Sequence, residues 1–215
     1  MSRRFILAFA RISLGLLAVV AIVRQLVIQI ELGFSVVNFF SYFTNLANIF
    51  AASVLILGAR RALAGHQTTR LGDQLRAAAV VYMAVVGVVF GVLLRAVDLG
   101  SLLPWVNFVL HVLMPCAVVV DWLLLPPRRI LTIRDLLLCL IVPVLYLVYV
   151  LIRGRLIGWY PYPFLSPDTG GGYRRVAVYI VGITATFLLL GWTLLALGKP
   201  RSSLGKHQSS RDAPR

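Results

Sequence analysis

The chain has 215 residues, of which 60% are apolar and only 13% are charged. A soluble domain of this size carries about 25% charged residues, and its core does not need apolar runs as long and as numerous as those found here. Length and composition therefore predict an integral membrane protein and exclude a separate soluble domain.

The formal net charge is +14, because 21 Lys and Arg residues outnumber 7 Asp and Glu residues. In a soluble protein this balance would indicate nucleic-acid binding. Here the basic residues stand at the ends of apolar runs, so we interpret them as signals of membrane topology and as contacts to anionic lipid. We expect membrane lipids as partners and no nucleic acid, and the sequence gives no oligomeric state. Cys116 and Cys139 lie inside apolar runs, and we expect no disulfide between them.

Six apolar stretches are each close to the ~20 residues that cross a bilayer core. They are Phe5–Val23, Asn38–Leu57, Ala77–Leu94, Pro104–Leu125, Leu136–Ile152 and Val176–Leu197. Backbone groups in hydrocarbon must be bonded within the segment, so each stretch is predicted to be a helix. We predict an all-α, polytopic bundle of six transmembrane helices over residues 1–198. The first stretch lacks a signal-peptide cleavage site and should be retained, with the long stem of Arg11 reaching toward the nearer interface.

The basic residues flanking these stretches are distributed unevenly between the two sides. One side carries Arg3, Arg4, Arg60, Arg61, Arg70, Arg76, Arg128, Arg129, Arg134, Lys199, Arg201, Lys206, Arg211 and Arg215. The other side carries Arg24, Arg95, Arg153, Arg155, Arg174 and Arg175. The positive-inside rule therefore places both termini in the cytoplasm of a multi-pass cell-membrane protein. Residues 199–215 have little apolar surface to bury and are predicted to be a disordered basic cytoplasmic tail.

The second stretch carries a polar face. At 100° per residue, five polar side chains fall on one side of the predicted helix: Asn38, Ser41, Thr44, Asn45 and Asn48. Such a face can hydrogen-bond to neighbouring helices, which is a common role for Ser, Thr and Asn in membranes. It can equally line a functional site, and the sequence leaves both interpretations open.

The fourth stretch contains an ionisable residue, His111, one turn after Asn107. A histidine within a span is either a functional group or a neutral ring hydrogen-bonded inside the bundle. Thr44 is six residues past Asn38 and His111 is seven past Pro104, so on parallel helices both should lie roughly 9 to 11 Å below the outer boundary. A hydroxyl and an imidazole at one depth can act as nucleophile and general base.

Several other polar residues are candidates for supporting roles. Asn45, Asn48 and Asn107 are placed to orient the histidine or to stabilise an oxyanion. Arg95 either pairs with Asp98, three residues on, or contacts a substrate carboxylate. Asp121 is ten residues past His111, about 15 Å deeper, and cannot be its direct partner.

The sequence offers too few ligand residues within the membrane for a metal or cofactor site. His66 falls in a cytoplasmic loop and His207 in the tail, which leaves one histidine within the membrane. Haem, zinc and di-iron sites all require more ligands than this, so we expect no metal and no cofactor.

The fifth loop, residues 159–173, is dense in aromatic residues, Pro and Gly. It is either an interfacial aromatic belt followed by a turn, or a semi-rigid lid hinged at its Gly run.

Three short features together resemble a known family. They are Phe43-Thr44 in the second helix, His111 followed by Pro115 in the fourth, and Tyr160-Pro161 after the fifth. Over residues 1 to about 198 the chain resembles the bacterial branch of the androgen-induced and androgen-regulated integral membrane protein family. Animal members are intramembrane threonine hydrolases that cleave fatty acid esters of hydroxy fatty acids. The resemblance implies that Thr44 is the nucleophile and His111 its partner.

We therefore expect an intramembrane hydrolase of lipid esters, with a lipid ester as its substrate. The alternative is a non-enzymatic channel, transporter or lipid-binding membrane protein, in which the polar face of the second helix lines a passage.

Overall fold

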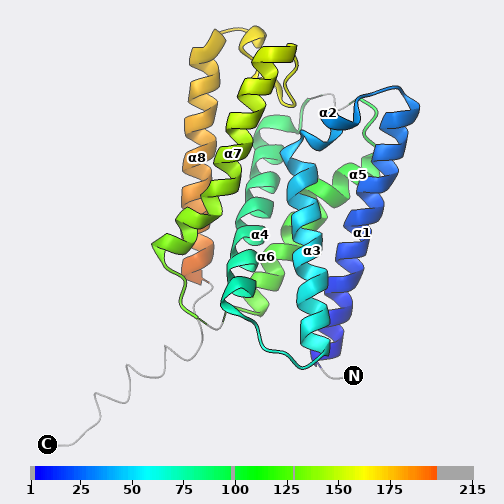
Figure 1. The fold of residues 1–215 in the computed structure, drawn as a ribbon, viewed down its shortest axis with the longest axis vertical. Coiled ribbons are helices and arrows are strands. Elements are labelled where there is room, and N and C mark those ends of the chain that lie inside the picture. The colour runs from blue at the N-terminus through cyan, green and yellow to red at the C-terminus, as the bar shows by residue number, and fades with distance from the viewer. Residues whose placement is uncertain (1–2, 98–99, 128, 198–215) are drawn as a thin grey trace, which may run out of the picture.

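The computed structural model describes residues 3–97, 100–127 and 129–197 (Figure 1). The elements are α1 (Arg3–Glu31), α2 (Val36–Phe40), α3 (Phe43–Leu63), α4 (Arg70–Val89), the π-helical turn η1 (Phe90–Leu94), α5 (Pro104–Phe108), the π-helical turn η2 (Val109–Leu113), α6 (Met114–Leu124), α7 (Ile133–Ile157), the short 3-10 helices η3 (Pro163–Leu165) and η4 (Pro167–Thr169), and α8 (Gly172–Leu197). The described residues contain no strand, and six helical segments are long and apolar enough to cross a membrane. The predicted all-α bundle of six spans is confirmed.

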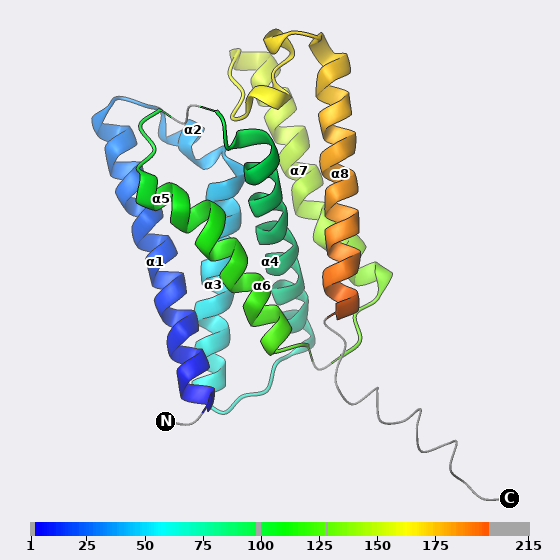
Figure 2. The same cartoon turned by 180° about the vertical axis from the view of Figure 1, so that it is seen from behind.

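The spans run alternately up and down, so α1 begins and α8 ends at the same end of the bundle (Figures 1 and 2). We call this the terminal end. The opposite end, here the loop end, carries α2 and the connection between α7 and α8. The predicted tail at 199–215 and Asp98 lie outside the described residues.

α4 is the central helix of the bundle. It contacts α3, α6, α7 and α8, and a larger share of its span is buried than in any other of the six. α1 packs against α3, most closely toward the terminal end, while α7 and α8 lie together on the other side of α4 (Figures 1 and 2). The site described below lies where α7 and α8 meet α3 and α4.

Small residues allow the helices to approach closely. Ala18, Ala47, Ala51 and Ala77 are all buried in the main core, and a side chain at Gly15 would collide with Ile56 on α3. Between lipid-embedded helices there is no hydrophobic driving force, so close packing of such small residues supplies much of the association energy. Many large apolar side chains point outward, among them Phe9, Leu16, Val20, Leu145, Val181 and Leu189.

The second span differs from the single helix predicted from Asn38. It is divided into α2 and α3, and Tyr42 between them has extended backbone angles. A continuous helix would bond the carbonyls of Phe39 and Ser41 to backbone N–H groups one turn further on. Here the Asn45 side chain donates to Phe39 O (2.8 Å), and the Tyr146 hydroxyl donates to Ser41 O (2.9 Å). Side-chain donors thus replace the backbone donors, and the break is stabilised.

Arg11 also differs from expectation, because it does not reach for the interface. Its guanidinium binds Asp121 on α6 in a bidentate pair, with Nε–Oδ1 at 2.6 Å and Nη2–Oδ2 at 2.9 Å. Arg76 on α4 donates to the same carboxylate (3.3 Å) and to Leu125 O (2.6 Å). A nearby carboxylate neutralises buried guanidinium charge more effectively than a distant interface. Asp121 is therefore occupied by arginines and is not a partner of His111, as its depth predicted.

Candidate functional site

A cavity of about 130 Å³ lies between α3, α4, α7, α8 and η3. Its wall is apolar except for a few hydroxyl groups. The lining residues are Phe43, Thr44, Val85, Val86, Val89, Leu94, Leu140, Pro143, Val144, Tyr146, Leu147, Tyr162, Phe164, Leu165, Ile180, Ile183, Thr184 and Phe187. An apolar cavity of about this size can accept an apolar group the size of benzene. The cavity can therefore hold part of a lipid.

The cavity reaches the outer surface of the bundle beside α7 and α8. Val144 is 54% exposed and Thr184 is also exposed, yet both line the cavity. This part of the surface belongs to α7 and α8, which are long and apolar enough to span a membrane, so in a bilayer it would face hydrocarbon. An apolar ligand can thus approach from the lipid without crossing water.

Thr44 stands in the cavity wall at the start of α3. It is the second residue of that helix and is only 7% exposed. The first N–H groups of a helix lack backbone partners, and Tyr42, which precedes α3, provides no side-chain cap. The Tyr162 hydroxyl acts as the missing cap. Its oxygen accepts a hydrogen bond from the Thr44 backbone N–H (N–O distance 3.3 Å) and lies 3.4 Å from Thr44 Oγ1.

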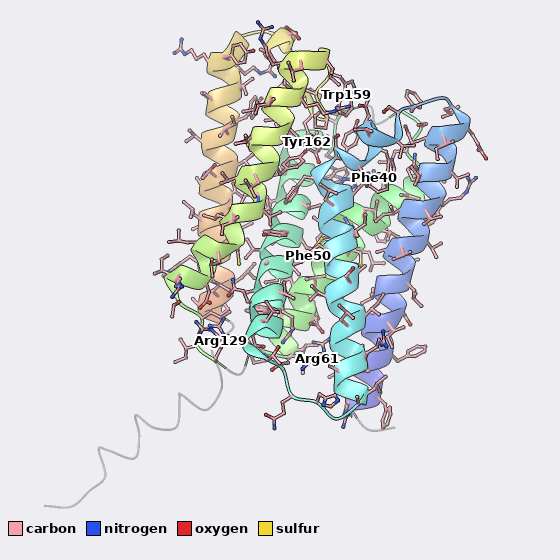
Figure 3. The ribbon with its side chains drawn as sticks, in the orientation of Figure 1. Phe40, Phe50, Arg61, Arg129, Trp159 and Tyr162 are labelled. Atoms are coloured by element: carbon pink, nitrogen blue, oxygen red, sulfur yellow. The ribbon has the colours of Figure 1, made fainter. Side chains whose placement is uncertain are left out.

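Tyr162 comes from the α7–α8 loop, which folds into the bundle. α7 ends at Gly158, whose φ of +67° favours glycine, and the chain then turns back toward α3. The Tyr162 ring stacks on Phe164 (5.0 Å between centroids) and meets Tyr42 edge-on (5.6 Å). Figure 3 shows Tyr162 and Trp159 between α7 and α2 at the loop end. Burial raises the pKa of the Tyr162 hydroxyl, so it stays protonated.

The loop is therefore neither a simple belt nor a free lid. Phe164 and Leu165 are buried with Leu94, Val150 and Val176 in a second apolar cluster. Sequence analysis missed Tyr162 as a site residue. The available signal was its position between Pro161 and Pro163, which stiffen the segment that carries it.

His111 lies in η2 and is 9% exposed. Its Nδ1 is 3.2 Å from the backbone carbonyl of Asn107, and its ring stacks on Phe90 of η1 at 4.3 Å. A carbonyl only accepts hydrogen bonds, so Nδ1 must carry the proton and Nε2 presents a lone pair. In this tautomer the ring has the form that a general base requires.

Asn48 connects the helices that carry Thr44 and His111. It is fully buried, and its Nδ2 donates to Thr44 O (2.9 Å) and to Leu110 O (3.1 Å). Because one nitrogen reaches both carbonyls, Thr44 and Leu110 lie at nearly the same depth, and His111 follows Leu110 directly. α3 and η2 are thus neighbours, with the two candidate residues at similar depth.

The side chains of Thr44 and His111 nevertheless have different neighbours. Thr44 contacts Tyr162, whereas His111 contacts Phe90 and Asn107. Within the described part of the chain no hydrogen bond joins Thr44 to His111, and His111 does not line the cavity. The structure thus brings the backbones of Thr44 and His111 close together, but the Thr44 hydroxyl and the His111 imidazole are not bonded to each other.

The remaining candidates have separate positions. Asn45 bonds to Phe39 O at the end of α2, away from the histidine. Asn107 orients His111 through its backbone carbonyl, while its own Oδ1 is buried without a partner. Arg95 is exposed directly after η1, and Asp98 lies outside the described residues. Asn38 accepts a bond from Arg153 of α7 (2.6 Å).

The described residues contain no group of three His, Cys, Asp or Glu side chains that could hold a metal ion. Cys116 and Cys139 are both free. Comparison with known proteins gives no match, since no family model, no curated protein and no solved structure is significantly similar to this chain.

Proposed function

We propose that the protein is an intramembrane hydrolase of lipid esters, with Thr44 as nucleophile and His111 as general base. The observation that carries the proposal is the position of the Thr44 hydroxyl in the wall of an otherwise apolar cavity that opens toward lipid. A lipid ester can enter such a cavity with its acyl chain, and its carbonyl then meets the hydroxyl. The resemblance to a family of threonine hydrolases supports the same assignment. From the distribution of basic residues, we place the protein in the cell membrane with both termini in the cytoplasm.

The start of α3 favours this chemistry. A helix N-terminus carries about half a positive charge, and Thr44 is the second residue of a 21-residue helix. This charge stabilises the negative oxygen that develops when a hydroxyl attacks an ester. The proton of Thr44 passes to Nε2 of His111, and because no direct bond joins the two groups, the transfer requires an intervening water or a rotation of the ring.

A second candidate function is lipid binding without chemistry. It is favoured by the contact of the Thr44 hydroxyl with Tyr162, where a nucleophile would have a base. A passage for solutes is less well supported, because the polar face of the second span is used for packing. Ser41 bonds to Val37 O and contacts the Tyr149 hydroxyl, while the Asn45 and Asn48 amides bond to backbone carbonyls.

The test is hydrolysis of a panel of lipid esters, including fatty acid esters of hydroxy fatty acids, by purified protein. Wild type should release fatty acid, Thr44→Ala should not, and Thr44→Ser should keep part of the rate because the hydroxyl remains. Thr186→Ala is the matched control, since Thr186 bonds to Gly182 O of its own helix and does not line the cavity. Binding of the esters without hydrolysis by wild type would support the second function instead.

A further inference from the structure

We propose that Tyr162 is a catalytic residue of this site, whose hydroxyl donates a hydrogen bond to the oxyanion formed when Thr44 attacks an ester. The inference rests on the hydrolase activity proposed above and assigns a role to the α7–α8 loop. With this role for Tyr162, the site in the cavity is incomplete without the α7–α8 loop.

The geometry gives Tyr162 a proton to donate at the right place. Thr44 N–H donates to the tyrosine oxygen, so the phenolic proton is left to point toward an acceptor. In the resting structure the phenolic oxygen lies 3.4 Å from Thr44 Oγ1, a contact in which either hydroxyl can be the donor and which is well beyond the 2.7–2.8 Å of a strong O–H···O bond. Such a weak bond is readily exchanged for one to a substrate oxygen in the same cavity.

The ring that carries the hydroxyl is held in place. Phe164 stacks on one face, Tyr42 packs edge-on, and the residue is 8% exposed. A donor fixed in advance in a largely apolar cavity needs little reorganisation during the reaction, which is the condition under which such donors contribute most. The raised pKa supports a donor role, because a protonated phenol is a poor base.

The step balances without any further reagent than water. Thr44 Oγ1 forms a bond to the carbonyl carbon, and the carbonyl electron pair moves to its oxygen, where the Tyr162 O–H bonds to it. The Thr44 proton goes to His111. Collapse expels the alcohol, which takes that proton and leaves the acyl group on Thr44 Oγ1. A water then attacks the acyl carbon and gives its proton to His111, and the second collapse releases the acid as Thr44 Oγ1 leaves and takes that proton back. Tyr162 keeps its own proton throughout.

The experiment compares Tyr162→Phe with Tyr149→Phe. The first keeps the stacked ring and removes only the hydroxyl. The second removes a hydroxyl that contacts Ser41 and lies outside the cavity wall. We expect Tyr162→Phe to lower kcat by roughly 10²- to 10³-fold with KM changed little, since the loss falls on the transition state. Tyr149→Phe should stay within a few-fold of wild type.

The outcomes separate this inference from the proposed function. If wild type hydrolyses esters and Thr44→Ala does not, but Tyr162→Phe keeps the wild-type kcat, the role of Tyr162 is overturned alone. If wild type hydrolyses nothing, both proposals fall. Replacement by 3-fluorotyrosine covers the case in which Tyr162→Phe does not fold. This replacement keeps the oxygen that accepts the Thr44 N–H at the start of α3, and it makes the phenol more acidic. If the hydroxyl takes part in the reaction, kcat should change, whereas kcat should stay unaltered if the hydroxyl is purely structural.

Discussion

Individual polar residues in this bundle have two kinds of role. Most hold the helices together. The Asn45 amide donates to Phe39 O, whose backbone donor is missing at the helix break, and Arg11 pairs with Asp121 between α1 and α6. Thr44 is different, because its hydroxyl faces a cavity and its contact there is long. In a membrane interior, where unpaired polar groups are costly, a weakly engaged hydroxyl is the residue most available for chemistry.

At this scale the first prediction concerns Asp121. Asp121→Asn removes the carboxylate to which the buried Arg11 and Arg76 both bind, and breaking such a pair should destabilise the protein by about 3 kcal/mol. Thermal unfolding in detergent measures the effect, with the exposed Asp168→Asn as control. Adding Arg11→Met should recover part of the loss, because one unpaired cation is removed. Hydrolysis per folded molecule should be unchanged, and a loss comparable to that of Thr44→Ala would contradict the assignment of Asp121 to the arginines.

A second prediction tests whether Thr44 and His111 act as a unit. Each single alanine variant should remove the attack step, so Thr44→Ala/His111→Ala should be little slower than either alone. The measurement is kcat/KM for one good ester with all four proteins. Losses that multiply would show that His111 acts independently of Thr44, for example only by stabilising the bundle against Phe90.

At the scale of elements, the six spans were predictable and the break within the second was not. A long apolar run is a local property of the sequence, and it forces a helix wherever the backbone lies in hydrocarbon. The break after Ser41 is not marked by Gly or Pro. Besides the nearby Asn45, it is stabilised by Tyr146, which is 105 residues away along the chain and donates to Ser41 O.

The candidate site, too, was predictable from the sequence only in part. Thr44 and His111 could be selected from the sequence because polar residues in apolar runs stand out. Tyr162 could not, because an aromatic residue in a loop at a membrane surface is ordinarily an interfacial anchor. Its role appears only when the loop folds back and the hydroxyl meets Thr44 N–H, 118 residues away.

At this scale the prediction concerns the packing of the α7–α8 loop against α7. Gly154 on α7 is in close contact with the Tyr160 ring, so a methyl group there must displace the ring. Gly154→Ala should destabilise the protein by about 1–3 kcal/mol, the usual cost of overpacking, and should slow hydrolysis by shifting Tyr162. Gly182→Ala on α8 is the matched control, because nothing lies within 4 Å of the added carbon and alanine favours a helix. Equal unfolding midpoints for both variants would contradict a tightly seated loop.

At the scale of the whole molecule, the bundle divides into a close-packed part and a more loosely attached pair. α4 is the most buried span, while only 22% of the α7 and α8 spans is buried, against 56% for α4. The cavity lies along the boundary between the two parts, with its opening on the α7–α8 side. The arrangement is compatible with the proposed lipid-ester hydrolysis, in which a rigid framework would hold Thr44 while the boundary admits an acyl chain.

The last prediction is the orientation of the bundle. The sequence assigns fourteen basic residues to the side of the two termini and six to the other side, so the terminal end should face the cytoplasm. Single cysteines can test this in a background without Cys116 and Cys139. Asp168→Cys lies exposed in η4 at the loop end, and Gln67→Cys lies exposed between α3 and α4 at the terminal end. A membrane-impermeant maleimide should label position 168 in intact cells and position 67 only after lysis. The opposite pattern would invert the bundle and place the Thr44 site near the cytoplasmic surface.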